Sequence, residues 1–250
     1  MNRLRFFRLL AAPCLLLIMS FLPVERPITV YLIGDSTMAN KQVKAYPEAG
    51  WGMPFTWFFD KSVKVDNRAM NGRSTRTFIE ENRWQSVADS LQEGDYVLIQ
   101  FGHNDEVKTK KSYIDEVGFQ KNLVRFIEET RTKKANPVLI TPVARRSFDS
   151  EGKIQETHAV YSQLVRDVAA AQKVPLIDLD KRSQALLQDM GVENSKLLYL
   201  HLIPGENPNY PAGKEDNTHF NELGARKMAQ LVLADIKALK LGLAERIVTP

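Results

Sequence analysis

The sequence predicts an α/β fold in which a mainly parallel sheet of five strands carries helices on both of its faces. From residue 28 onward, short apolar runs alternate with segments of helical periodicity. The strand-like runs are continuously apolar and do not alternate with polar residues, which is typical of strands covered on both faces. Such an alternation of strand and helix predicts parallel strands joined by right-handed crossovers.

Five strands and three long helices can be placed along the chain. We expect strands at residues 28–33, 63–65, 96–101, 137–141 and 174–179, of which the third (YVLIQF) and fourth (PVLIT) are the clearest. We expect helices at residues 119–130, 160–171 and about 221–239, where apolar residues recur every three or four positions. In open parallel sheets ligands bind beyond the carboxyl ends of the strands, so we expect the chemistry there.

The first 23 residues differ in composition from the rest of the chain. Three arginines and no acidic residue precede an almost entirely apolar run from Leu9 to Leu22. A basic start followed by such a run predicts a signal peptide over residues 1–23, and therefore an exported domain, periplasmic or secreted, over residues 24–250. The run is shorter than the roughly 20 apolar residues of a membrane-spanning helix. An uncleaved anchor is the alternative, because no cleavage site can be placed.

Charge and cysteine content restrict the classes of function. The formal net charge is +4, and removal of residues 1–23 would take away three arginines and leave +1. So small a charge gives no support for nucleic-acid binding. Cys14 is the only cysteine and lies in the apolar run, so the exported chain would have no disulfide. The domain is large enough to be stable without one.

Four short polar motifs lie where the predicted strands end or the last helix begins. They are GDST at 34–37, NGRS at 71–74, GHND at 102–105 and DNTH at 216–219. Each taken alone is also typical of a turn or a helix cap. Together they supply a nucleophile, two anion-stabilising groups and a base with its orienting carboxylate, all at places that a parallel sheet would bring to one edge.

Each motif has residues suited to one part of an acyl transfer. Gly34 permits a sharp turn, and Ser36 would then open a helical segment whose free N–H groups can stabilise an anion. Asn104 can aim its amide at a developing oxyanion. Asp216, three residues before His219, can accept the imidazole N–H and fix its tautomer. The G-x-S-x-G motif is absent, as are metal-ligand and phosphate-loop motifs, so we expect no metal and no cofactor.

As a set, these motifs resemble those of the SGNH/GDSL hydrolases, and in particular the rhamnogalacturonan acetylesterase-like branch. LIGDSTM at 32–38, GWG at 50–52 and TPVARRSF at 141–148 add to the likeness, which spans about residues 28–240. The resemblance implies a single flavodoxin-like domain with three α/β/α layers. It also implies that Ser36 is the nucleophile, that Asp216 orients His219 as general base, and that the oxyanion hole combines the N–H groups of Ser36 and Gly72 with the Asn104 side chain.

The resemblance implies a serine esterase that removes acetyl groups from a carbohydrate, such as pectic rhamnogalacturonan or a related plant polysaccharide. Its partner would be the acetylated poly- or oligosaccharide. Trp51 is a candidate to stack on a sugar ring, and Arg145 and Arg146 are candidates to hold uronate carboxylates. A place in the core for Trp51 and ion pairs for the two arginines are the alternatives. Segment 197–214 matches no pattern, and we expect it to shape the substrate cleft.

Two other functions remain open from the sequence. A lipid- or thioester-directed esterase or acyltransferase would use the same catalytic groups on the same fold. A non-catalytic carbohydrate-binding domain is the second, although it would have no need of Ser36 or His219. His103, His158 and His201 receive no catalytic role, because single histidines are more often surface or packing residues.

Overall fold

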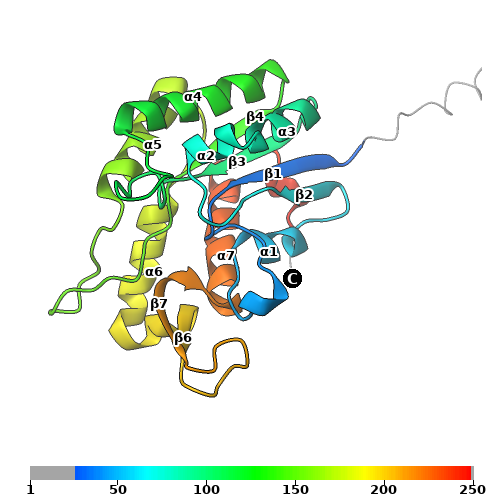
Figure 1. Cartoon of the computed structure of the whole chain (residues 1–250). Helices are drawn as coiled ribbons and strands as arrows, with labels where there is room; N and C mark the ends of the chain where they lie inside the picture. Colours follow the sequence, from blue (N-terminus) through cyan, green and yellow to red (C-terminus); the bar gives the residue numbers. More distant parts are fainter. Residues whose placement is uncertain (1–25, 249–250) are drawn as a thin grey trace, which may run out of the picture.

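The computed structural model describes residues 26–248, so the predicted signal peptide lies outside the described residues. Five parallel strands form the central sheet in the order β2-β1-β3-β4-β5 (Figure 1). The strands are β1 (Ile28–Gly34), β2 (Val63–Asn67), β3 (Tyr96–Gln100), β4 (Asn136–Ile140) and β5 (Leu176–Ile177). The chain moves outward from β1 to β2 and then crosses to β3 on the other side of β1. The carboxyl ends of β1 and β3 therefore flank a topological switch point, where ligands bind in such sheets.

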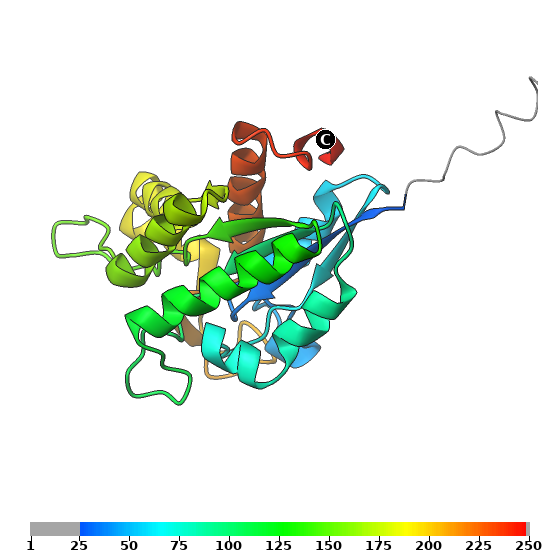
Figure 2. The ribbon, with the colours of Figure 1, turned by 90° about the horizontal axis from the view of Figure 1, so that it is seen from above.

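Helices cover both faces of the sheet, as Figures 1 and 2 show. They are α1 (Gly52–Phe55), α2 (Thr75–Glu80), α3 (Arg83–Ser90), α4 (Glu116–Thr132), α5 (Ala159–Gln172), α6 (Leu179–Asn194) and α7 (Glu222–Ala238). Buried side chains of α1, α6 and α7 belong to one apolar cluster, and those of α2 to α5 belong to another. The predicted three-layer α/β/α arrangement is confirmed.

Successive residues of each strand point alternately into these two clusters. Leu32 in β1 and Leu98 in β3 belong to the cluster that contains α7, whereas the neighbouring Ile33 and Ile99 belong to the cluster that contains α4, and none of the four is exposed. Because successive strand residues point to opposite faces, a strand covered on both sides is apolar at every position. This is the physical reason for the continuous runs in the sequence.

Two elements differ from the expectation. Strand β5 has only two residues of the expected strand 174–179: residues 174 and 175 are irregular, Asp178 accepts the N–H of Lys181, and α6 begins at Leu179. Helix α6 itself was not predicted from the sequence. Its apolar residues do not form one regular stripe, and Gly191 interrupts it with a non-helical φ of 72°.

A β-hairpin replaces the unmatched segment before the last helix. Strand β6 (Tyr199–Leu202) pairs antiparallel with β7 (Lys214–Phe220), and a loop joins them (Figure 1). Asn221 then caps α7 by accepting the N–H of Gly224 at 3.0 Å. The hairpin thus holds the DNTH motif immediately before the capped N-terminus of α7. Over residues 26–248, no helix has both the length and the apolar character needed to cross a bilayer.

Candidate active site

The structure brings together the predicted serine, histidine and aspartate, although Ser36 and His219 lie 183 residues apart in the chain. Oγ of Ser36 lies 2.9 Å from Nε2 of His219, which is hydrogen-bond distance. Nδ1 of the same imidazole lies 2.9 Å from Oδ2 of Asp216. A hydroxyl, an imidazole and a carboxylate in this order can pass a proton from the hydroxyl to the ring while the carboxylate stabilises the charged ring.

Ser36 lies in a turn directly after β1, so the expected helix start at this position is wrong. The next helical segment is a short 3-10 helix at Val43–Ala45. Asp35 holds the turn instead, because its Oδ1 accepts the N–H and the O–H of Thr37 at 2.9 and 2.8 Å. Asp35 is completely buried, and burial raises the pKa of its carboxyl against the opposing effect of those hydrogen bonds.

Asp216 and His219 lie on a bulge of strand β7, where the sequence suggested a loop. Tyr199 pairs with Phe220 but its neighbour Leu200 pairs with Asp216, so residues 217–219 bulge out of the ladder. Oδ1 of Asp216 accepts the main-chain N–H groups of Thr218 and His219 at 2.8 and 3.0 Å. The other carboxylate oxygen is thereby directed to the imidazole.

Electrostatics favour the charged carboxylate at this position. Burial alone would raise the pKa of Asp216, but hydrogen bonds from the His219 imidazole and from two N–H groups outweigh it and hold the pKa well below its ordinary value. Asp216 is therefore ionised at neutral pH. An ionised carboxylate keeps the proton of the ring on Nδ1 and leaves Nε2 free to accept the serine proton.

The predicted oxyanion groups lie on two further turns. Gly72 is exposed and has a φ of +76°, which favours glycine, and no other group lies near the position of a side chain. Nδ2 of Asn104 donates to the carbonyl oxygen of Arg73 at 3.0 Å, and Oδ1 accepts from Lys110 at 3.4 Å. Because an amide has two N–H donors, the second is available to a ligand while the first fixes the orientation.

Asp105, the last residue of GHND, connects this motif to the NGRS turn. It is completely buried, and its Oδ1 accepts both the N–H and the O–H of Thr75 at 2.7 Å. Its other oxygen accepts the N–H of Gly102 at 3.1 Å. Burial raises the pKa of Asp105 to about 7, although these hydrogen bonds oppose the shift. The sequence suggested only a cap for Asp105, because its partner Thr75 is 30 residues away.

The structure contradicts the surface role considered for Trp51. Its side chain is completely buried, and its indole N–H donates to Oε1 of Gln100 at 2.7 Å. Its main-chain N–H donates to the carbonyl of Thr37 at 2.9 Å. A side chain at the preceding Gly50 would come within 2.2 Å of the carbonyl oxygen of Ala39. The GWG motif therefore packs closely against the turn that carries Ser36 and offers no ring to a ligand.

Arg146 is also not placed to bind a substrate. Arg146 is only 9% exposed, and its guanidinium donates to Oγ of Ser195, Oδ1 of Asn217 and the carbonyl of Val192. Its main-chain N–H donates to the carbonyl of Asn217 at 2.8 Å. Arg146 thus anchors the bulge that carries the Asp-His pair. Two adjacent arginines look alike in sequence, and only tertiary packing distinguishes this one.

Arg145 is the arginine that remains accessible. Its side chain is 31% exposed, and Nη1 donates to Oγ1 of Thr218, the residue before His219, at 2.9 Å. Nη2 lies 3.8 Å from Oε1 of Glu106, a loose ion pair. Arg145 therefore connects the region of His219 with the loop that follows GHND.

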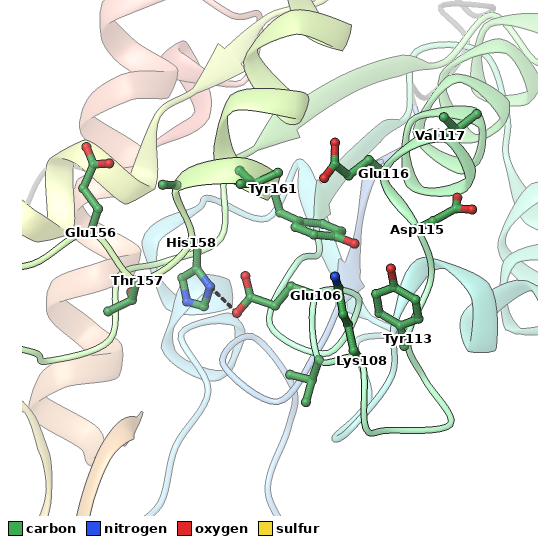
Figure 3. A pocket seen from close by; sticks show the side chains of 13 residues that line it. Glu106, Lys108, Tyr113, Asp115, Glu116, Val117, Glu156, Thr157, His158 and Tyr161 are labelled. Carbon is green, nitrogen blue, oxygen red and sulfur yellow. Dashed lines mark hydrogen bonds and ion pairs between the residues drawn. The ribbon is translucent and has the colours of Figure 1, made fainter.

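A pocket of about 790 Å³ lies beside that loop, and Figure 3 shows it from close by. It lies between the loop before α4 and the start of α5. Its lining includes Glu106, Lys108, Tyr113, Asp115, Glu116, Glu156, His158 and Tyr161. Nδ1 of His158 lies 2.8 Å from Oε1 of Glu106, as the dashed line marks. Four carboxylates against one lysine make the lining acidic.

His103 and His158 are in contact, which was not predicted from the sequence. Both side chains are buried, and their ring centroids lie 4.2 Å apart. Burial, the neighbouring His158 and Arg145 lower the pKa of His103 well below its ordinary value, so this ring is neutral at neutral pH. No local signal could predict the pair, because the two residues come from different loops. Within residues 26–248, no group of three or more His, Cys, Asp or Glu side chains is arranged to hold a metal ion.

Comparison with known proteins identifies the same region of the chain. The model of the GDSL-like lipase/acylhydrolase family matches residues 32–227. Rhamnogalacturonan acetylesterase RhgT of Bacillus subtilis (strain 168) is 42% identical over 227 residues, which are 90% of this chain and 97% of the relative. The probable rhamnogalacturonan acetylesterase YesY of the same organism is 36% identical over 221 residues, 88% of this chain and 97% of that protein.

A solved structure supports the fold. The crystal structure of protein YxiM from Bacillus subtilis has a TM-score of 0.76 and 28% sequence identity, and the match covers 86% of this chain and 58% of that one. The family match includes the turn of Ser36, the GHND loop and the Asp216–His219 bulge. By its sequence, its three-layer fold and its relatives, this chain belongs to the GDSL-like lipase/acylhydrolase family.

Proposed function

We propose that this protein is a serine esterase that removes acetyl groups from a carbohydrate. The observation that carries the proposal is the continuous contact from Ser36 through His219 to Asp216, at 2.9 Å for each step. The two relatives described above span nearly the same length and are named as rhamnogalacturonan acetylesterases. We infer the same class of substrate, an acetylated pectic polysaccharide or oligosaccharide, for this chain.

The geometry supports the following steps. His219 takes the proton of Ser36 as Oγ attacks the ester carbonyl carbon. The carbonyl oxygen, now negative, accepts hydrogen bonds from the N–H groups of Ser36 and Gly72 and from the free N–H of Asn104. The tetrahedral intermediate collapses to an acetyl-serine, and the sugar hydroxyl leaves with the proton from His219. Water, deprotonated by His219, then attacks the acetyl-serine and releases acetate and free Ser36.

Charge distribution suggests how a polymer of neutral and acidic sugars would lie. Arg145 is an accessible guanidinium next to the catalytic bulge, and arginine matches a uronate carboxylate in two-pronged geometry. The pocket of Figure 3 is lined by four carboxylates, which accept hydrogen bonds from sugar hydroxyls but repel a uronate. We place the acidic sugar toward Arg145 and an uncharged sugar unit in the pocket.

We base the proposed cellular location on the sequence of the N-terminus. A signal peptide over residues 1–23, as the sequence predicts, would export residues 24–250 to the periplasm or beyond. There the enzyme would meet plant polysaccharide and take part in its degradation. N-terminal sequencing of the protein recovered outside the cytoplasm tests this, because a mature chain that still begins at Met1 would contradict cleavage.

Two measurements test the proposed activity. Acetate release from acetylated rhamnogalacturonan, acetylated xylan and short- and long-chain p-nitrophenyl esters should be fastest for a carbohydrate acetyl ester. The Ser36→Ala variant should lose the acetyl-enzyme and nearly all turnover, whereas the Ser150→Ala variant, in an exposed turn, serves as the matched control. Full activity of Ser36→Ala would exclude a serine mechanism, and a preference for octanoyl esters would favour a lipid-directed enzyme.

A further inference from the structure

A buried lysine joins the nucleophile turn to the NGRS turn. The side chain of Lys41 is 2% exposed. Its ammonium group donates to the main-chain carbonyl of Ser36 at 2.6 Å and to Oδ1 of Asn71 at 2.9 Å. The carboxylate of Glu48 lies 2.6 Å away and balances the charge. A buried ammonium surrounded in this way holds its three partners in one fixed arrangement.

The two turns that Lys41 joins supply two of the proposed oxyanion donors. One donor is the N–H of Ser36, on the same residue as the carbonyl that Lys41 binds. The other is the N–H of Gly72, which belongs to the peptide unit that begins at Asn71. An oxyanion hole works only when its donors lie about 2.7–3.1 Å from the position of the charged oxygen. The separation of these two turns therefore matters for the rate.

The third donor is connected to the same set of contacts. Nη1 of Arg73 donates to the carbonyl of Asn71 at 2.9 Å, and the carbonyl of Arg73 accepts from Asn104 at 3.0 Å. Hydrogen bonds thus run from Ser36 through Lys41 and Asn71 to Arg73 and Asn104. Each proposed oxyanion donor therefore lies on a residue of this hydrogen-bond network or next to one.

We propose that Lys41 is a positioning residue that sets the spacing between the Ser36 and Gly72 donors through Asn71. The proposal rests on the esterase mechanism proposed above. Lys41 itself touches no reacting atom. It acts by keeping the hole in the geometry of the transition state, before substrate arrives, which lowers the cost of reorganisation during the reaction.

Asn71, the exposed partner of Lys41, gives the sharpest test. The Asn71→Ala variant removes the acceptor while the Lys41–Glu48 pair stays intact, and Asn71 is exposed, so stability should change little. We expect kcat on p-nitrophenyl acetate to fall about tenfold with KM nearly unchanged, less than the roughly 10²–10³ of a lost donor. Lys41→Met should lower kcat at least as much, and Lys44→Met, at an exposed neighbouring lysine, should leave it unchanged.

A double variant separates positioning from simple stabilisation. Lys41→Met leaves the half-buried carboxylate of Glu48 without its partner, and Lys41→Met with Glu48→Gln removes that charge. If Lys41 only neutralised Glu48, the double variant would regain the parent kcat. We expect it to regain thermal stability but to remain slow, and the effects of Lys41→Met and Asn71→Ala on kcat should not add.

The outcomes of this experiment differ from a failure of the proposed function. An unchanged kcat in Asn71→Ala, or a full recovery in the Lys41/Glu48 double variant, would overturn the positioning role while Ser36→Ala still abolished turnover. Full turnover in Ser36→Ala would instead overturn the esterase mechanism. Because p-nitrophenyl acetate contains no sugar, neither result depends on which polysaccharide is the substrate.

Discussion

At the scale of single residues, the proposed base His219 and its orienting carboxylate Asp216 are held by contacts within four positions of the chain. Asp216 accepts the N–H groups of Thr218 and His219 with one oxygen and faces the imidazole with the other. This local arrangement makes the pair recognisable in sequence as D-x-x-H. Oγ of Ser36, in contrast, reaches the ring only through the tertiary fold.

The depressed pKa of Asp216 leads to a prediction about the pH dependence of activity. A carboxyl whose folded pKa lies below its ordinary value stays charged until the solution is strongly acidic. Asp216 should therefore stay charged between pH 4 and 8 and add no step to the acid limb of log kcat/KM in that range. A step in that limb that disappears in the Asp216→Asn variant would show that Asp216 titrates there.

Removal of one oxyanion donor has a separate expected effect. Asn104→Ala should lower kcat roughly 10²–10³-fold with little change in KM, because the amide is needed mainly when the carbonyl oxygen becomes negative. Asn194→Ala, at the exposed end of α6, is the matched control. A kcat equal to that of the parent enzyme would remove Asn104 from the hole.

Residue roles were predictable from the sequence only where a motif fixes the local geometry. The turn of Ser36, the GHND loop and the Asp216–His219 pair lie where the motifs placed them, and their chemical roles stay predictions. Trp51 and Arg146 are candidates for ligand binding by side-chain type, but both are buried, and for Trp51 the alternative place in the core is confirmed, because side-chain type alone does not reveal burial. Lys41 carries no signal, since its two hydrogen-bond acceptors lie on two different turns.

At the scale of elements, the site depends on hydrogen bonds that join turns from different parts of the chain. Asp105 after β3 holds Thr75 at the start of α2, and Arg146 after β4 holds the bulge of β7. The five strands and three of the long helices followed from their periodicity. The β6–β7 hairpin and α6 were not predictable from periodicity. The hairpin has a bulge at residues 217–219, and α6 is interrupted at Gly191.

The contact of Asp105 predicts a pH-dependent stability. Burial raises the pKa of Asp105 from 3.8 to about 7, so the folded chain binds this proton more tightly than the unfolded chain. The free energy of unfolding should therefore decrease as pH rises from about 4 to about 7, by at most about 1.4 kcal/mol per pH unit from this group. Asp105→Asn cannot titrate, so its unfolding free energy should change less steeply over that range. Identical slopes in urea titrations of both proteins would contradict the shifted pKa.

At the scale of the whole molecule, the sheet order decides where the catalytic groups meet. The crossing of the chain from β2 to β3 opens a crevice between the ends of β1 and β3, and Ser36 and Asn104 lie there. The hairpin then carries Asp216 and His219 to the same edge, beside the accessible Arg145. The acidic pocket lies next to the loop that carries Asn104. The fold thus places two accessible cations near the reaction centre, Arg145 and Lys214, whose ammonium group lies 3.9 Å from Oδ2 of Asp216, and an acidic pocket beside them.

This distribution predicts a preference that depends on the charge of the substrate. Arg145→Gln should lower kcat/KM for acetylated oligosaccharides that contain uronate more than for neutral acetylated oligosaccharides. A charge-assisted hydrogen bond from a guanidinium contributes roughly 1.5–3 kcal/mol, which is about ten- to a hundredfold in affinity. Because Arg145 also donates to Thr218 next to His219, rates on p-nitrophenyl acetate must be measured to correct for any effect on the chemical step.

The matched control for this substitution is Arg125→Gln. Arg125 lies on α4 in an exposed ion pair with Glu129. It carries the same charge, so its removal reproduces the change in net charge without touching the site. If both variants lose the preference for uronate equally, long-range attraction explains it and Arg145 makes no direct contact. A loss confined to Arg145→Gln that persists at high salt requires a short-range contact, because salt screens distant charges far more than paired ones.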